Sequence, residues 1–269
     1  MKNSRRYDRP VKIGAGIYWV GYRDEQTNFQ CNPFLIVQDD AAVLIDSGSR
    51  SDFAIVMMKI LQAGVGPENI VALIYQHYDP DLCGSMPNFI DMCDNPDLKV
   101  FSEKNNNIFI SYYIQKEKYH LVQSIDAYGY KLDFNGRTLQ FLPTPYAHNP
   151  GSFVTYDEKT KTLFSSDIFG SFSAKQELFL QLDDACFACA DYSDCPNRKN
   201  YCPLPDIIAF HETVMPCKKS LRKSMRIIKE MDIDMVAPQH GSIFDNKRDI
   251  HHIIAKLESL EKVGIDGIE

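Results

Sequence analysis

Several features are missing from this sequence of 269 residues, and each absence excludes a class of protein. No apolar run approaches the roughly 18 residues that a membrane-spanning helix needs. The first residues, MKNSRRYDRPVKIG, are basic but lack the apolar core of a signal peptide. No internal repeat or low-complexity linker divides the chain. We therefore expect a cytoplasmic protein that forms a single domain over residues 1–269 and does not associate with a membrane.

An excess of positive charge is also absent. The chain carries 29 lysines and arginines against 36 acidic residues, for a formal net charge of −7. An acidic protein has no electrostatic reason to seek nucleic acid, so nucleic acid is not an expected partner. The local exception is a basic run whose spacing predicts a solvated helix face, with a phosphate- or partner-binding patch as the alternative; it comprises Lys218, Lys219, Arg222, Lys223 and Arg226. The sequence is compatible with a homodimer but does not decide the oligomeric state.

β-rich runs alternate with helical patterns along the chain. Strands are predicted at 16–22, 32–38, 41–46, 71–77 and 98–102, and a strand and turn at 235–244. Hairpins are predicted at 130–145, around Asn135-Gly136, and at 152–167. Helices are predicted at 51–64, 86–93, 211–231 and 247–263, while 104–128 is ambiguous between helix and loop. This alternation predicts an α/β protein with two sheets and outer helices, an αββα sandwich.

Histidine or aspartate follows a β-rich run at four separate places. These residues are His77, Asp79 and Asp81 in HYDPDLCG, His148 in PYAHNPGS, Asp167 in LFSSDIFG and His240 in APQHGS. Imidazoles and carboxylates bind borderline divalent metals, and a rigid strand end holds them in place. The alternation at 77, 79 and 81 would point all three side chains to one side of an extended loop. Each residue alone has an ordinary interpretation as a cap, core or turn residue. Their combined order favours a metal site.

The order of these motifs resembles that of the metallo-β-lactamase superfamily, over nearly the whole chain from GIYWVGY to His240. The segment NPFLIVQDDAAVLIDSGS is similar to the opening hairpin of that fold, with Asp46 at its usual turn after a strand. The resemblance implies the αββα sandwich that the pattern of elements also predicts.

Within the superfamily, the motif at 77–82 resembles flavodiiron proteins more than hydrolases. Hydrolases usually carry HxHxDH and flavodiiron proteins HxExDH, and the second place here is Asp79, a carboxylate. LFSSDIFGSF is also similar to the flavodiiron segment with the bridging aspartate. The resemblance implies that metal 1 is bound by His77, Asp79 and His148, metal 2 by Asp81 and His240, and both by Asp167. A carboxylate-rich set favours two iron ions, with manganese or zinc as alternatives. Leu82 stands where a ligand histidine is expected, which leaves metal 2 one ligand short or completed by water.

The function implied by the resemblance is that of a non-heme diiron protein which binds or reduces oxygen, peroxide or nitric oxide. Flavodiiron proteins normally append a flavodoxin domain, and this sequence ends at Glu269 without one. We therefore expect no internal flavin and an external electron donor, as in stand-alone diiron relatives, some of which bind oxygen as sensors. One alternative is a two-metal hydrolase acting on a phosphodiester or thioester. The other is a non-catalytic module with a degenerate metal site.

A cysteine-rich insertion is predicted at residues 181–205. It contains Cys186, Cys189, Cys195 and Cys202. Four thiolates suit a zinc ion or an iron–sulfur cluster, although the spacing matches neither zinc ribbons nor ferredoxins. Reduced structural thiols and a regulatory disulfide are the alternatives. The other four cysteines are expected to be buried as apolar residues; they are Cys31, Cys83, Cys93 and Cys217.

His211 opens the segment HETVMP before the basic run. It is interpreted either as part of a helix cap or as a catalytic group beside the open face of the metals. Trp19 is expected in the core or in a pocket wall.

Overall fold

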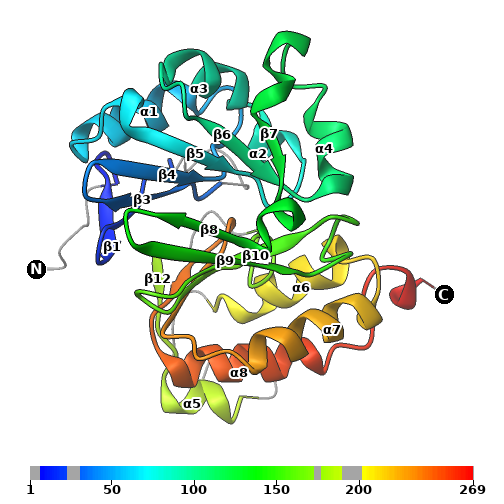
Figure 1. Cartoon of the computed structure of the whole chain (residues 1–269). Helices are drawn as coiled ribbons and strands as arrows, with labels where there is room; N and C mark the ends of the chain where they lie inside the picture. Colours follow the sequence, from blue (N-terminus) through cyan, green and yellow to red (C-terminus); the bar gives the residue numbers. More distant parts are fainter. Residues whose placement is uncertain (1–6, 23–30, 173–176, 190–201, 269) are drawn as a thin grey trace, which may run out of the picture. The chain divides into compact units, whose positions relative to one another are not determined.

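The computed structural model describes residues 7–22, 31–172, 177–189 and 202–268 (Figure 1). Its described residues form two compact units. The first contains residues 7–22, 31–141 and 157–160, and the second contains 142–156, 161–172, 177–189 and 202–268. Within these ranges, no helix is both long and apolar enough to cross a membrane.

A seven-stranded sheet forms the centre of the first unit. Its strands follow one another in chain order: β1 (Val11–Gly14), β2 (Ile17–Trp19), β3 (Phe34–Gln38), β4 (Ala41–Ile45), β5 (Ile70–Ile74), β6 (Lys99–Ser102) and β7 (Val122–Ser124). Strands β1 to β4 pair antiparallel, and β4 to β7 pair parallel. Because β4 and β5 are parallel, the residues that follow them, including Asp46 and His77, leave the sheet at the same edge.

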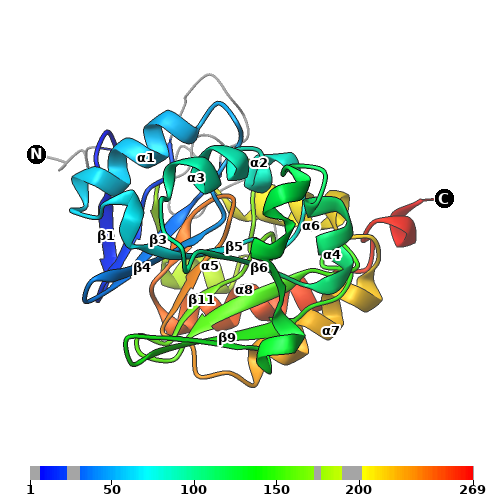
Figure 2. The same ribbon diagram turned by 45° about the horizontal axis from the view of Figure 1, so that its top comes forward.

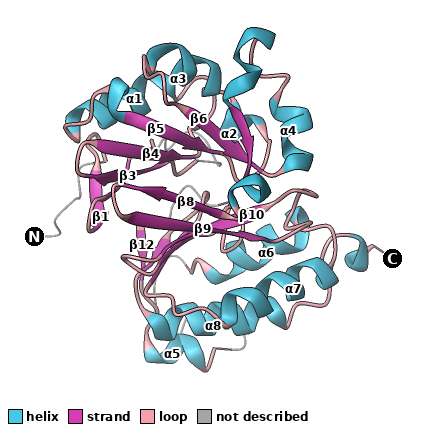
Figure 3. Cartoon of the chain, viewed as in Figure 1, coloured by secondary structure: helices cyan, strands magenta, loops and turns pink. Residues whose placement is uncertain are grey.

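Helices connect the parallel strands of the first unit, as Figure 3 shows by colour. They are α1 (Phe53–Gln62), α2 (Pro80–Cys83), α3 (Met86–Met92) and α4 (Lys104–Ile110), with the short 3-10 helices η1 (Pro67–Asn69) and η2 (Lys116–Leu121). A third 3-10 helix, η3 (Ile125–Tyr128), follows the last strand, β7. The predicted helix at 51–64 ends where expected, because Gly64 adopts a positive φ of 85° just after it. The ambiguous stretch 104–128 contains α4, η2, β7 and η3. Trp19 is fully buried, as expected.

A hairpin of β8 (Lys131–Phe134) and β9 (Arg137–Pro143) turns at Asn135 and Gly136, which both have positive φ. Two positive φ angles are what a tight two-residue hairpin turn needs, so this prediction is confirmed. Near the turn, the buried Arg137 guanidinium donates to both carboxylate oxygens of Asp157, at 2.9 and 2.6 Å. Both charges are fully buried, and each satisfies the other.

The second unit contains strands in the order β12-β14-β13-β11-β10. Their bounds are Phe179–Leu180 for β12, Ile243–Phe244 for β14, Met235–Ala237 for β13, Thr162–Phe164 for β11 and Phe153–Asp157 for β10, whose last residue falls in the first unit. Strand β11 pairs parallel with β13, and β13 pairs antiparallel with β14. The predicted strand and turn at 235–244 is therefore a pair of short strands joined by the loop that carries His240.

The helices of the second unit are α5 (Asp184–Phe187), α6 (Leu204–Val214), α7 (Lys218–Lys229), α8 (Lys247–Glu258) and the short η4 (Ile265–Gly267). Helices α7 and α8 lie against each other, as Figure 2 also shows. The prediction of one helix over 211–231 is wrong. Pro216 explains the break, because a proline forces the residue before it out of the helical region, and Met215 has an extended ψ of 137°. His211 thus lies inside α6 and not at the cap of α7.

The basic run lies on a solvated face of α7, where three of its cations, and Lys229 after it, pair with acidic side chains. Lys218 and Arg222 contact Glu261 at 2.8 and 2.5 Å. Arg226 and Lys229 contact Glu258 at 3.8 and 3.4 Å. These pairs favour the solvated-face interpretation over a phosphate-binding patch, because nearby carboxylates oppose the binding of an anion.

Candidate metal centre

His77 is held at the end of β5 by a contact between neighbouring strands. Gln76 donates its backbone N–H to Asp46 Oδ1 and its side-chain amide to Asp46 Oδ2, both at 3.2 Å. Asp46 follows β4, so this pair ties together the two strand ends. His77 is 1% exposed. The sheet therefore fixes the backbone that leads into His77, and a buried side chain on a fixed backbone loses little conformational freedom when it binds a metal.

Asp79 and Asp81 approach His77 by a route that the sequence pattern did not predict. The expected extended loop is wrong at Asp81, because Asp79 is extended, with ψ of 153°, and Pro80 then begins the one-turn helix α2. Proline favours the first position of a helix, where its fixed φ fits and no N–H is needed. The outcome is nevertheless a cluster: His77 Nε2 lies 3.9 Å from Asp79 Oδ2, and all three residues offer ligand atoms within 4.8 Å of one another.

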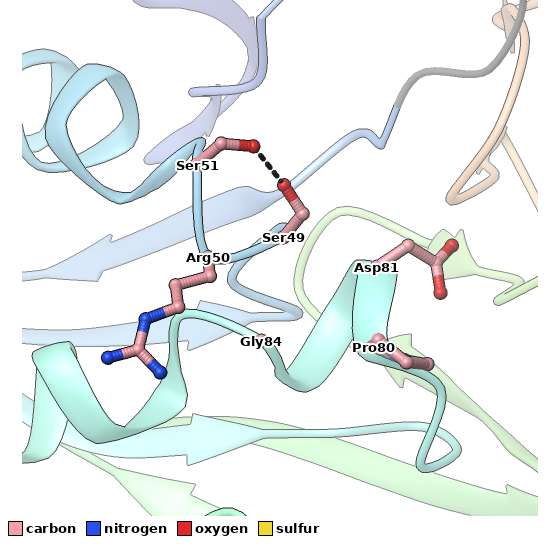
Figure 4. A pocket seen from close by; sticks show the side chains of 6 residues that line it. All are labelled: Ser49, Arg50, Ser51, Pro80, Asp81 and Gly84. Carbon is pink, nitrogen blue, oxygen red and sulfur yellow. Dashed lines mark hydrogen bonds between the residues drawn. The ribbon is translucent and has the colours of Figure 1, made fainter.

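Leu82, where the resemblance expects a histidine, is fully buried in the apolar core of the first unit. Cys83 beside it is buried as well, and burial raises the pKa of its thiol well above the usual range. Figure 4 shows α2 from the side of an open pocket that is lined by Ser49, Arg50, Ser51, Pro80, Asp81 and Gly84. Asp81 lines this pocket, whereas Leu82 packs inward. Position 82 therefore belongs to the core.

Cys31 contacts the same aspartate from another part of the chain. Its Sγ lies 2.9 Å from the backbone oxygen of Asp81 and 3.5 Å from Oδ2. The expected burial of Cys31, Cys83 and Cys93 is confirmed, but Cys31 lies beside a carboxylate. Sequence reasoning missed this contact, because 50 residues separate the partners and no local pattern connects them. Cys217 departs from the prediction, since it is half-buried at the start of α7.

Asp167 and His240 of the second unit are brought together by two parallel strands. In β11 and β13, Phe164 pairs with Ala237, and each ligand candidate follows its strand by three residues. The ladder continues past the strands, because Gln239 N–H donates to Ser166 O at 2.8 Å. Because both residues lie three positions beyond a paired residue of parallel strands, their side chains leave the sheet at the same height along β11 and β13. His240 Nε2 lies 3.5 Å from Asp167 Oδ1, and both residues are about 2% exposed.

His148 lies against the other oxygen of the same carboxylate. It comes from the loop between β9 and β10, and its Nε2 lies 2.8 Å from Asp167 Oδ2. The two oxygens of Asp167 thus face two different imidazoles, His148 on one side and His240 on the other. One carboxylate that presents each oxygen to a separate nitrogen donor is the arrangement expected of a ligand shared by two cations.

His211 supports the loop that carries Asp167. Its Nδ1–H donates to Ile207 O at 2.7 Å, and Nε2 accepts the backbone N–H of Phe169 at 3.0 Å. Phe169 has a positive φ of 69°, a conformation that costs energy for a bulky residue and needs support. Burial lowers the pKa of His211 to about 4, so the imidazole is neutral near pH 7. In this structure, His211 holds a backbone in place through two hydrogen bonds.

The described part of the cysteine insertion packs against the core of the second unit. Cys186 and Cys202 are half-buried beside that core, and Cys189 is also half-buried. Cys195, with all of 190–201, lies outside the described residues. The prediction of a zinc ion or iron–sulfur cluster at these four cysteines therefore stays a prediction.

The donor set of the six candidate ligands fits a pair of iron ions. It contains three imidazoles and three carboxylates, which is an oxygen-rich set without a soft donor among the six. Such ligands suit iron and manganese, whereas thiolate-rich sets suit copper(I) and many zinc sites. The burial of His77, Asp167 and His240 also places much of this set away from bulk water.

A family model described as the ODP family of β-lactamases matches residues 29–241. Among solved structures, the rubredoxin:oxygen oxidoreductase of Desulfovibrio gigas superimposes with a TM-score of 0.77 at 21% identity, covering 93% of this chain and 61% of that one. A chemotaxis sensor, ODP, solved as a peroxy diiron species, gives 0.72 at 22% identity and covers 96% of both chains. These likenesses confirm the predicted metallo-β-lactamase fold class.

Sequence comparison finds relatives that match most of this chain. An uncharacterised protein of Methanocaldococcus jannaschii is 28% identical over 91% of this chain and 59% of its own length. The coenzyme F420H2 oxidase of Methanothermobacter marburgensis is 26% identical over 87% of this chain and 57% of its own. The chain thus spans less than two thirds of the length of these relatives. With the family model matching most of its length, the chain belongs to the ODP family of β-lactamase-fold proteins and is flavodiiron-like.

Proposed function

We propose that the protein is a non-heme diiron protein that binds or reduces a small oxidant: oxygen, peroxide or nitric oxide. The proposal joins the two ligand sets into one centre. His77, Asp79 and His148 would hold metal 1, Asp81 and His240 would hold metal 2, and Asp167 would bridge them. The observation that carries the proposal is the placement of the two Asp167 oxygens beside different imidazoles, at 2.8 and 3.5 Å.

These distances fit ligands that share an ion. A nitrogen and an oxygen donor at about 2.0 to 2.2 Å from one metal, at angles between octahedral and tetrahedral, lie about 2.8 to 3.5 Å apart. Both Asp167 contacts fall in that range. The pair His77–Asp79 is slightly wider, at 3.9 Å, and needs only a small side-chain adjustment.

Two iron ions would supply redox electrons and open coordination positions for a small oxidant. The protein side chains would supply the rest. Asp167 would fix the spacing of the ions. His211 would keep the Asp167 loop rigid through the Phe169 N–H. Because His211 is neutral, it would add no positive charge that repels the metals.

The names of the relatives support an oxidant as the ligand. They include an F420H2 oxidase and, in Moorella thermoacetica, a nitric oxide reductase that is 24% identical over 88% of this chain. Sustained reduction of an oxidant would require an external electron donor. A sensor would instead react once per reduced centre. The paired cations of α7 give no support to a phosphodiesterase.

The direct test is to load the metal-free protein with Fe²⁺ under anaerobic conditions and then add oxygen or nitric oxide. We expect two irons per chain and a change in visible absorption with each oxidant. Repeated turnover on addition of a reductant would identify a reductase, and a single turnover would identify a sensor. A two-iron protein that is indifferent to oxygen, peroxide and nitric oxide would overturn the proposal, as would hydrolysis of a phosphodiester by that protein.

A further inference from the structure

We infer that Cys31 is a ligand of metal 2, bound as a thiolate beside Asp81. This inference rests on the proposed diiron centre and adds to it a soft donor from a segment outside all of the candidate ligand motifs. Cys31 would occupy the coordination position on metal 2 that a histidine fills in the family motif and that Leu82 cannot fill in this chain.

The geometry within the first unit carries the inference. Cys31 Sγ lies 3.5 Å from Asp81 Oδ2. A sulfur at about 2.3 Å and an oxygen at about 2.0 to 2.2 Å from one ion, at 90° to 109°, lie about 3.1 to 3.6 Å apart. The observed separation therefore matches two ligands of one metal. The Cys31 thiol also donates to the backbone oxygen of Asp81, at 2.9 Å, a bond that holds the sulfur at that residue until the thiol proton is lost.

Leu82 cannot take the role of the missing histidine. Its side chain is fully buried in the apolar core of the first unit and has no donor atom. Asp81, one residue earlier on the same helical turn, lines the open pocket of Figure 4. A replacement donor must therefore reach Asp81 from a different segment, and Cys31 does so.

Cys31 is positioned before any metal arrives. The adjacent Asn32 is 3% exposed and accepts a hydrogen bond from the indole N–H of the fully buried Trp19, at 2.9 Å. Pro33 accepts the backbone N–H of Val20 at 3.0 Å. These bonds anchor the chain next to Cys31, and Cys31 itself is 9% exposed. A donor held in this way loses little conformational freedom when it binds.

Binding of the metal removes one proton from Cys31. The thiol loses this proton to the buffer, and the sulfur donates an electron pair to the metal without a change of oxidation state. A thiolate next to Asp81 would add one negative charge at metal 2. It would also give that metal an intense sulfur-to-metal absorption that imidazoles and carboxylates do not give.

Cobalt(II) substitution tests the inference without recourse to activity. We expect two cobalt ions per chain in the wild type and a near-ultraviolet sulfur-to-cobalt band. In a titration with cobalt(II), the Cys31→Ser protein should lack the part of that band which appears when the second equivalent of cobalt is added. Cys93→Ala is the matched control, since Cys93 is also buried in the first unit but faces its core. It should leave the difference spectrum unchanged, and any cobalt at Cys186–Cys202 would contribute equally to all three proteins.

A second measurement does not depend on the folding of Cys31→Ser. In the wild type, two equivalents of zinc or cobalt should slow alkylation of Cys31 by about tenfold or more, as read by peptide mass spectrometry. Two bound metals with an unchanged Cys31 alkylation rate and no Cys31-dependent band would overturn the inference and leave the diiron proposal standing. Fewer than two metals, with none at Asp81, would overturn both.

Discussion

The two units hold their ligand candidates in different ways. In the first unit, three of them lie within five residues, and a strand end plus one helical turn gathers them. In the second unit, His148, Asp167 and His240 come from three segments of the chain, and the parallel pair β11–β13 brings two of them to one level. Local sequence therefore determines the first set, whereas the second depends on the fold.

The supporting contacts differ in kind. The first set is held by a contact between two neighbouring strand ends, since Gln76 donates twice to Asp46, 30 residues earlier. The second set depends on a buried histidine from a helix, since His211 supports the Phe169 backbone. We expect the loss of Asp167 to affect the whole metal centre, whereas the loss of a ligand that serves one ion should affect that metal alone, in either unit.

The largest effect is expected at the bridge. Asp167→Asn keeps the shape of the side chain but removes its charge and one carboxylate oxygen, so both metals should be lost together. Metal analysis after dialysis should fall from two ions per chain to none. Asp245→Asn, an exposed change in the same unit, should retain both. Retention of one tightly bound metal by Asp167→Asn would contradict a shared carboxylate.

Loss of a single metal is expected when a ligand serves only one ion. His240→Ala should release metal 2 and spare metal 1, whereas Asp79→Ala should do the opposite. Isothermal titration with Fe²⁺ or Mn²⁺ should show one remaining site in each variant. If either variant loses both ions, the assignment of His240 and Asp79 to separate metals is wrong.

Restoring the family residue at position 82 should harm the protein without helping the metal site. Leu82→His would bury an imidazole in an apolar core and should cost about 3 to 5 kcal/mol of unfolding free energy. Urea denaturation of the metal-free protein would measure it, with Leu82→Met as the volume-matched control, which should cost less than about 1.5 kcal/mol. A stable Leu82→His protein with tighter metal 2 binding would show that this side chain can turn toward Asp81.

A smaller, pH-dependent effect is expected at His211. Its pKa is lowered by burial from 6.5 to about 4, so the unfolded chain takes up this proton first as the pH falls. The contribution of neutral His211 to the free energy of unfolding is therefore fully present above pH 6.5 and is lost progressively as the pH falls toward 4. At pH 5, the protonation of this histidine in the unfolded chain should lower the free energy of unfolding by about 2 kcal/mol relative to pH 7.

The control for this effect is His211→Gln, whose amide can still donate to Ile207 and accept from Phe169 but does not titrate. In the metal-free state, the stability difference between wild type and His211→Gln should shrink by about 2 kcal/mol between pH 7 and pH 5. A difference that stays constant with pH would mean that His211 does not remain neutral in the folded protein.

Much of the fold could be predicted from the sequence, because local patterns determine it. Asn135-Gly136 requires a tight turn, and Gly64 ends α1 with a positive φ, so these boundaries follow from backbone chemistry. The prediction of one helix at 211–231 was wrong, because the amphipathic pattern of this stretch obscured the effect of Pro216. The prediction of an extended loop at 77–81 was wrong for a related reason, because Pro80 begins a helix.

The candidate site was only partly predictable. The six residues were found from motif order, but the ionic contacts of Asp167 depend on the register of β11 and β13, which no local pattern encodes. The contact of Cys31 with Asp81 and the support of Phe169 by His211 join residues that are 50 and 42 positions apart. Contacts of this kind follow from tertiary packing, so sequence patterns alone did not predict them.

The claim that the two ligand sets form one bridged centre is tested most directly by electron paramagnetic resonance of the iron-loaded protein after half-reduction. Two irons that share Asp167 should couple their spins and give the signal of a single mixed-valent pair, and Asp167→Asn should abolish it. Separate, uncoupled iron(III) signals from a protein that binds two irons per chain would contradict the bridge and, with it, the diiron account.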